Sequence, residues 1–219
     1  MEALIDTRDE FQDLWGLYLP IGVAVAAIVF GLVLFTVVRY RRRDDELPRG
    51  RESPPIIEGL YALLLAAVVV FLLVMTFRTD DEVTAVSAEP GAKIDVTAFQ
   101  WGWRFTYPGE GVTVVGDDQR PPTLVVPVDT AVQFTLESRD VIHSFWIPEV
   151  RFKRDAFPER ETTFDLSFES QDMIGRCAEF CGLAHAEMTF DVVGMAQADF
   201  RDWLRTQRRA GEIQRGEVR

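Results

Sequence analysis

Both cysteines of the chain lie in one short stretch, CAEFCGLAHAEM, which also contains one of its two histidines. Cys177, Cys181, His185 and Met188 follow one another at intervals of four, four and three residues. The other histidine, His143, lies in the segment DVIHSFWIP. Thiols, imidazoles and thioethers are metal-ligand types, and a chain with so few histidines does not use them as generic polar residues. The pattern therefore predicts a metal site.

The ligand types distinguish between a disulfide, zinc and copper. Two cysteines at this spacing can form a disulfide in an oxidising compartment if the loop bends suitably. Zinc binds Cys and His, but it gains nothing from a thioether. Thiolate and imidazole with a weak thioether ligand describe copper electron-transfer sites. A mononuclear site needs only one cysteine, so the second one favours a dinuclear copper centre with two bridging thiolates and one imidazole for each metal. Met188 and a backbone carbonyl would be the weak ligands, and no position would remain open for a substrate.

Two apolar runs near the N-terminus are long enough to cross a membrane, so they determine on which side of it the site lies. Residues 14–38 and 59–77 contain no charged side chain over 25 and 19 positions. At about 1.5 Å per residue, helices of this length can cross a hydrocarbon core about 30 Å thick. Acidic residues precede the first run where a signal peptide would be basic, so we expect it to stay in the mature protein. The sequence predicts a transmembrane hairpin over residues 1–79, with helices at about 14–38 and 57–77.

The connection between the runs, residues 39–56, is rich in arginine. Membrane orientation follows the Lys and Arg content of short loops, so we expect this loop to face the cytoplasm and the region after residue 79 to lie on the outer side. The site would then belong to a multi-pass protein of the cell membrane, which we expect to be a bacterial plasma membrane. The net charge of −12 argues against a nucleic-acid partner and favours a basic one.

The outer region, residues 80–196, has the pattern of an all-β domain. Val132, Phe134 and Leu136 alternate with polar residues, and the same period of two recurs at residues 164–168 and 188–192. Gly, Pro and Asp clusters separate the predicted strands, as in a sandwich or barrel. Residues 197–219 are expected to form a C-terminal helix, at about 197–209, and a basic tail.

Together these motifs resemble subunit II of the cytochrome c oxidase family over roughly residues 14–195. The resemblance rests on CAEFCGLAHAEM, preceded by DVIHSFWIP and FKRDAFPER, and on a two-helix hairpin before an external β-domain. It implies a membrane-anchored all-β protein with a cupredoxin-like Greek-key barrel and a mixed-valence pair of copper ions. The implied metal ligands are His143, Cys177, the backbone carbonyl of Glu179, Cys181, His185 and Met188.

The same resemblance implies partners and a direction of electron flow. Electrons would come from cytochrome c and pass to a haem in subunit I, where oxygen is reduced to water, in a respiratory complex that also contains subunit III. The Glu179 side chain would also reach a magnesium or manganese ion shared with subunit I. The chain has no C-x-x-C-H haem-attachment motif, so its donor must be a separate molecule or another subunit.

The resemblance implies a functional role for two further residues. The sequence around each residue also allows a purely structural role. Trp101, in FQWGWRF, would be the electron-entry residue, whereas tryptophans in a β-domain commonly pack in the core. Many relatives have an aromatic residue where this chain has Gly102, which leaves the local packing there open. Glu58, in IIEGLY, would be the mouth of a proton channel into subunit I, or else a carboxylate at the membrane interface.

Two alternative functions fit the same motifs. The domain could serve a copper-containing nitric oxide reductase of the same superfamily, which the partner subunit would distinguish. It could also be a stand-alone copper-binding or copper-delivery protein, which would hold one weakly bound copper. A quinol oxidase subunit is disfavoured, because that branch lacks these copper ligands.

Overall fold

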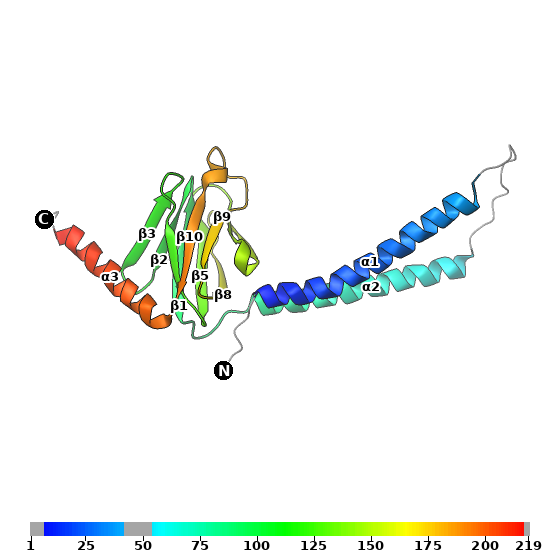
Figure 1. Cartoon of the computed structure of the whole chain (residues 1–219), viewed down its shortest axis with the longest axis horizontal. Helices are drawn as coiled ribbons and strands as arrows, with labels where there is room; N and C mark the ends of the chain where they lie inside the picture. Colours follow the sequence, from blue (N-terminus) through cyan, green and yellow to red (C-terminus); the bar gives the residue numbers. More distant parts are fainter. Residues whose placement is uncertain (1–6, 42–53, 217–219) are drawn as a thin grey trace. The chain divides into compact units, whose positions relative to one another are not determined.

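The computed structural model describes residues 7–41 and 54–216 and divides into two compact units. One unit, residues 11–81, contains most of two long helices, α1 (Thr7–Arg39) and α2 (Pro55–Val83), which run side by side (Figure 1). Most of the connection between the helices, including Arg42, Arg43, Arg49 and Arg51, lies outside the described residues.

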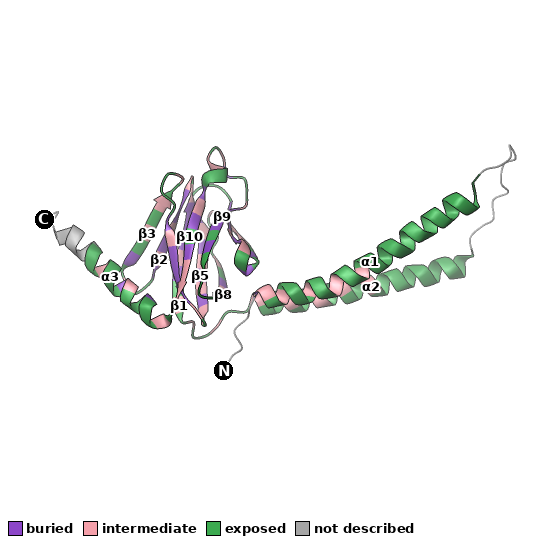
Figure 2. Ribbon diagram, in the orientation of Figure 1, coloured by how far each residue is buried: buried purple, intermediate pink, exposed green. Residues whose placement is uncertain are grey.

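The two helices are apolar around their whole circumference. Their side chains are exposed along almost their full length (Figure 2), and both helices are long and apolar enough to cross a membrane. Such a surface is stable in hydrocarbon, not in water, so the pair fits a membrane anchor. Tyr18 Oη donates a 2.8 Å hydrogen bond to the backbone oxygen of Leu72 and also contacts Thr76, which joins the two helices. Both helices extend beyond the charge-free runs, because charged turns at a helix end can lie outside the hydrocarbon.

The second unit contains a sandwich of two five-stranded sheets. One sheet has the order β3-β2-β1-β5-β8 and the other the order β4-β10-β9-β6-β7. The β1/β5 and β10/β4 pairs are parallel, whereas the remaining neighbours are antiparallel. The strands are β1 (Ala92–Phe99), β2 (Gly102–Tyr107), β3 (Val112–Asp117), β4 (Thr123–Pro127), β5 (Ala131–Ser138), β6 (His143–Ile147), β7 (Phe152–Ala156), β8 (Thr162–Ser167), β9 (Asp172–Cys177) and β10 (Thr189–Met195).

Aromatic side chains fill the space between the sheets. Phe134 stacks on Phe164 with ring centroids 5.5 Å apart, and Phe145 stacks on Phe190 at 5.0 Å. All four are fully buried, which stabilises the sandwich by roughly 1.5–3 kcal/mol for each ring. The residues predicted to alternate inward, Val132, Phe134 and Leu136 among them, are buried, so the period-two pattern identified real core faces.

A third helix, α3 (Gln197–Gly216), packs against the sandwich through Phe200 and Leu204, which are buried. It is longer than the predicted 197–209. Its Trp203 ring lies edge-on to Tyr107 at 5.2 Å. Two short 3-10 helices, η1 (Pro148–Val150) and η2 (His185–Glu187), complete the described elements.

Candidate metal centre

Three segments of the β4-β10-β9-β6-β7 sheet bring the predicted ligands together at one end of the sandwich. His143 begins β6, Cys177 ends β9, and Met188 immediately precedes β10. The Cys177 N–H donates to the Met188 carbonyl at 2.9 Å, and the Ala178 N–H donates to the Ser144 carbonyl at 3.0 Å. These bonds continue the strand ladders into the ligand residues, so rigid strands hold the two ends of the cysteine loop.

The side chains form a compact cluster of sulfur and nitrogen atoms. Cys177 Sγ lies 3.8 Å from Cys181 Sγ, 3.8 Å from His143 Nδ1 and 3.2 Å from the Glu179 backbone oxygen. Cys181 Sγ lies 3.6 Å from His185 Nδ1 and 3.8 Å from Met188 Sδ. Both thiols are free. Each cysteine sulfur therefore has one imidazole nitrogen beside it. The Cys177 sulfur also has a backbone carbonyl beside it, and the Cys181 sulfur has a thioether.

The cluster is largely shielded from water. His143 is fully buried, and Cys177, Cys181 and Met188 expose 6, 3 and 1% of their surface. The ring of Trp103 lies 6.4 Å from the His143 ring, so part of the wall is aromatic. His185 is only partly buried, and the Glu179 side chain is exposed. The site thus has a dry interior and one imidazole near the surface.

The two thiols differ in acidity. Burial alone would raise the pKa of Cys177, but hydrogen bonds from His143 and from the Ser144 backbone outweigh it and lower the value to about 6. Burial, with the negative charge of Cys177, raises the pKa of Cys181 to about 12. The pKa of His143 is raised, because hydrogen bonds to Cys177 and Asp140 outweigh its burial. Without metal, the site therefore favours one thiolate beside one thiol.

Asp140 positions His143, a role that the sequence did not indicate. Its Oδ1 lies 2.9 Å from His143 Nε2, which leaves Nδ1 of the ring facing Cys177. Asp140 also accepts hydrogen bonds from the backbone N–H groups of Gln100, at 2.8 Å, and Val141, at 2.7 Å. Burial raises the pKa of this carboxyl, but these hydrogen bonds outweigh it and lower the value. A carboxylate that fixes the orientation of a ligand histidine is a common feature of metal sites, and the D-x-x-H spacing was its only signal.

Trp101 lies beside the cysteine loop. Its Nε1 donates to the Cys181 carbonyl at 3.1 Å, and its ring is partly buried against the core. Trp103, two residues later, is fully buried, so the two indoles have different environments. Gly102 between them has no room for a side chain, because an added Cβ would lie 2.2 Å from the Gly116 carbonyl. The approach of β3 explains why an aromatic residue does not fit there.

Glu58 lies in the first turn of α2 and is exposed.

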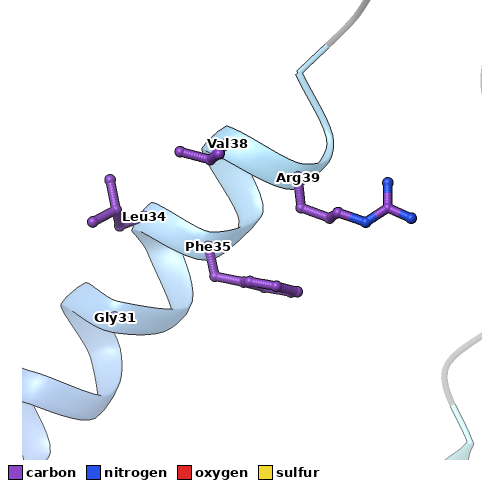
Figure 3. A pocket seen from close by; sticks show the side chains of 5 residues that line it. All are labelled: Gly31, Leu34, Phe35, Val38 and Arg39. Atoms are coloured by element: carbon purple, nitrogen blue, oxygen red, sulfur yellow. The ribbon is translucent and has the colours of Figure 1, made fainter.

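Elsewhere in the hairpin, α1 has an open hollow lined by Gly31, Leu34, Phe35, Val38 and Arg39 (Figure 3). Four of these residues offer no side-chain donor or acceptor, so this surface lacks the groups that metal binding or proton transfer requires.

The donor set fits copper. The ligand atoms of His143, Cys177 and Cys181 all lie within 4.8 Å of one another. The surrounding thioether and imidazole are soft or intermediate donors that suit copper, and a paired set of donors suits two ions.

Comparison with known proteins agrees with the fold. Residues 113–195 match the family model described as "Cytochrome C oxidase subunit II, periplasmic domain". A probable cytochrome c oxidase subunit 2 of Nocardia farcinica is 28% identical, over 92% of this chain and 71% of the relative. One of Streptomyces avermitilis is 28% identical, over 92% of this chain and 75% of the relative. Over most of its length the chain is therefore similar to cytochrome c oxidase subunit 2 proteins, and residues 113–195 resemble the periplasmic domain of that family.

A solved structure of a subunit II domain shares the sandwich. This is the periplasmic domain of subunit II of cytochrome oxidase of Bradyrhizobium japonicum, which is 28% identical to the chain with a TM-score of 0.50. The match covers 57% of this chain and 99% of that domain. The fold is therefore the predicted one, a two-helix anchor followed by a cupredoxin-like domain.

Proposed function

We propose that this chain is subunit II of a cytochrome c oxidase and that, as part of this enzyme complex, it binds two copper ions and transfers electrons, one at a time, from cytochrome c to the haem of subunit I, where oxygen is reduced to water. One observation carries the proposal. Two free thiols lie 3.8 Å apart, and each has an imidazole Nδ1 within 3.8 Å. A mononuclear site would have no use for the second sulfur.

Each residue has a distinct part in holding the metals. Cys177 and Cys181 would hold the copper ions through their thiolates, and His143 and His185 would each contribute one imidazole nitrogen. Met188 Sδ and the Glu179 carbonyl would complete the donor set. When bound, the copper pair supplies a centre that can gain or lose a single electron.

The protein keeps these ligands in place during that exchange. The strand hydrogen bonds at Cys177 and the carboxylate of Asp140 hold Cys177 and His143, so we expect these two residues to move little when the redox state changes. Small rearrangement favours fast electron transfer.

Trp101 is the proposed point of electron entry. Its indole is in hydrogen-bond contact with the Cys181 carbonyl, which gives a short bonded route from the indole to a bridging ligand. Its partial exposure leaves part of the ring accessible to a donor.

Other assignments complete the proposal. The exposed Glu179 side chain would reach a magnesium or manganese ion shared with subunit I, and Glu58 would admit protons to that subunit. Subunit III would belong to the same complex. The hairpin would span a bacterial plasma membrane, with the copper domain on its outer side.

Metal analysis and electron paramagnetic resonance of the full-length chain in detergent test the proposal. The expected result is two copper ions per chain and a seven-line hyperfine pattern, because one unpaired electron is shared by two copper nuclei. One copper per chain with a four-line pattern would contradict it and would instead support a copper-delivery protein.

A further inference from the structure

Gln100 has no assigned role, yet it makes hydrogen bonds to both segments that contain the predicted ligands. Its side-chain Nε2 donates to the Cys181 carbonyl at 2.7 Å. Its backbone N–H donates to Asp140 Oδ2 at 2.8 Å, and the other oxygen of Asp140 pairs with His143. The described structure thus connects Gln100 to the cysteine loop directly and to His143 through one carboxylate.

The Cys181 carbonyl accepts two hydrogen bonds from adjacent residues. Gln100 Nε2 and Trp101 Nε1 both donate to it, at 2.7 and 3.1 Å, and so use both of its lone pairs. Only the NH₂ end of a glutamine amide can donate, so the carbonyl fixes the orientation of the Gln100 side chain. The shorter bond comes from Gln100, which makes it the better placed of the two donors.

Close packing at Gly182 strengthens this contact. Gly182 has φ +119°, a conformation that favours glycine, and a Cβ there would lie 3.2 Å from Gln100 Nε2 and 3.2 Å from Trp101 Nε1. The absence of a side chain lets the Gln100 amide and the Trp101 ring lie directly on the Cys181–Gly182 peptide.

From these contacts we propose that Gln100 is a positioning residue for electron entry. Its amide holds the Cys181 carbonyl in contact with the Trp101 indole, and its backbone N–H fixes Asp140 and through it the His143 ring. Gln100 would touch neither the donor nor a metal. The inference rests on the proposed electron-transfer function, because it assigns Gln100 a role at the same site.

Two physical effects follow from loss of the amide. A hydrogen-bond donor on a ligand residue withdraws electron density from it, so it favours the reduced, more electron-rich state of the centre. Removal of the donor should therefore lower the redox potential. Loss of the shorter bond should also loosen the contact between Trp101 and Cys181 and weaken electronic coupling along that route.

Gln100→Met and Gln100→Glu test the inference in the full-length chain. Methionine has a similar length but no donor, and glutamate has the same shape but offers only acceptors to the Cys181 carbonyl. Gln119→Met is the matched control, because the Gln119 amide bonds to Asp118 on the turn after β3. Gln100 is exposed, so the substitutions should leave the unfolding temperature close to that of the control.

The first measurement uses the copper-free chain. Alkylation of the thiols by iodoacetamide should be at least threefold faster in both Gln100 variants than in Gln119→Met, because the cysteine loop is less firmly held.

The second measurement uses the copper-loaded chain. In both variants the redox potential should fall and electron entry from reduced cytochrome c should slow at least threefold. In Gln100→Met, which adds no charge, the affinity for the donor should stay unchanged.

The outcomes separate this inference from the proposed function. If the wild-type chain forms no dinuclear centre, the proposed function fails before Gln100 is tested. If the wild type forms the centre but the Gln100 variants match Gln119→Met in thiol reactivity, redox potential and electron entry, the positioning role alone is overturned. A loss of donor affinity without a change in potential would also overturn it, because that result would place Gln100 in the docking surface.

Discussion

The Asp140 carboxylate lies 2.9 Å from Nε2 of His143, and this contact changes which acids are suited to testing donor docking. From its sequence alone, Asp140 belongs with Asp117, Asp118 and Glu149 as an acid that attracts a basic cytochrome c. In the structure, both of its oxygens accept hydrogen bonds within the site. Neutralising Asp140 would therefore disturb His143 as well as the surface charge.

Glu149 is a cleaner probe of electrostatic steering. It lies on η1 and is exposed. Glu149→Gln removes one charge beyond the end of β6 opposite His143, so it should slow donor association modestly at low ionic strength, and the difference should shrink as salt screens charges beyond about 8 Å. Stopped-flow binding of cytochrome c across a salt series measures this effect. A difference that does not depend on salt would show that Glu149 acts through contact and not through its charge.

Trp101 should affect a different step. Trp101→Phe removes the N–H that donates to Cys181 but retains an aromatic surface. Donor affinity should stay nearly unchanged, while electron transfer within the complex slows severalfold at every salt concentration. Rapid kinetics at saturating donor measure the transfer step separately from binding. If only affinity changes, Trp101 is a docking residue and electrons enter elsewhere.

The ligand assignment predicts a graded response to substitution. Cys177→Ser or Cys181→Ser should reduce the metal content from two copper ions to at most one, because a hydroxyl is a poor substitute for a bridging thiolate. Met188→Leu should keep two coppers and raise the redox potential. Met173→Leu is a matched control, since Met173 is buried on β9 but is not one of the predicted ligands. A normal two-copper spectrum in Cys181→Ser would rule out the assignment.

The sequence predicted that these side chains lie close together, because their spacing is local. Cys177, Cys181, His185 and Met188 all belong to the segment that runs from the end of β9 to the start of β10, so few conformations could separate them. Period-two patterning likewise identified the inward faces of β5 and β8, because hydrophobic burial determines which face turns inward.

The roles of Gln100 and Asp140 could not be read in the same way. Gln100 reaches Cys181 across 81 positions of sequence, and this contact depends on how one sheet packs on the other. Asp140 is three residues from His143, but an aspartate near a histidine on an acidic surface is equally consistent with docking. Long-range hydrogen bonds leave little trace in a single sequence.

Asp95 gives a pH-dependent prediction away from the metal site. Burial, and then the negative charge of Glu137, raises the pKa of Asp95 above 3.8. A carboxyl with a raised pKa in the folded state destabilises the fold when it is ionised, so this cost is present at neutral pH and disappears as pH falls below both pKa values. Asp95→Asn should therefore stabilise the domain at pH 7. The gain should be about 0.5 kcal/mol or less, because Asp95 is only partly buried and water still screens its charge.

Thermal unfolding of the wild type and Asp95→Asn at pH 7 and at pH 3 measures the effect. Glu137→Gln keeps an acceptor for Thr97, which donates to Glu137 at 3.2 Å, and should remove part of the same cost. The double variant should then gain less than the sum of the two single gains. An equal gain at both pH values would show that the effect does not come from the charge of Asp95.

Glu58→Gln tests the proposed proton path in the assembled oxidase. The substitution keeps the size of the side chain but removes its ability to take up and release a proton. Steady-state oxygen reduction should slow severalfold, while electron entry from the donor stays fast. Equal slowing of both steps would indicate misassembly, and unchanged oxygen reduction would make Glu58 an ordinary interfacial carboxylate.

Tyr107 links the two sheets through a single buried hydroxyl, and its removal should cost much more than an exposed hydrogen bond. The Tyr107 side chain on β2 donates to the Val125 carbonyl at 2.9 Å and accepts from the Val125 N–H at 3.0 Å, at the edge strand β4 of the opposite sheet. Burial raises the pKa of this phenol well above 10.0, so it stays protonated and can donate throughout the physiological range.

Tyr107→Phe retains the ring contacts with Trp203 but leaves two buried backbone groups unpaired. The free energy of unfolding should fall by about 1–3 kcal/mol, measured by thermal or denaturant unfolding of the β-domain. An unchanged stability would mean that water reaches Val125 when the hydroxyl is removed, and that β4 does not depend on Tyr107 for its position.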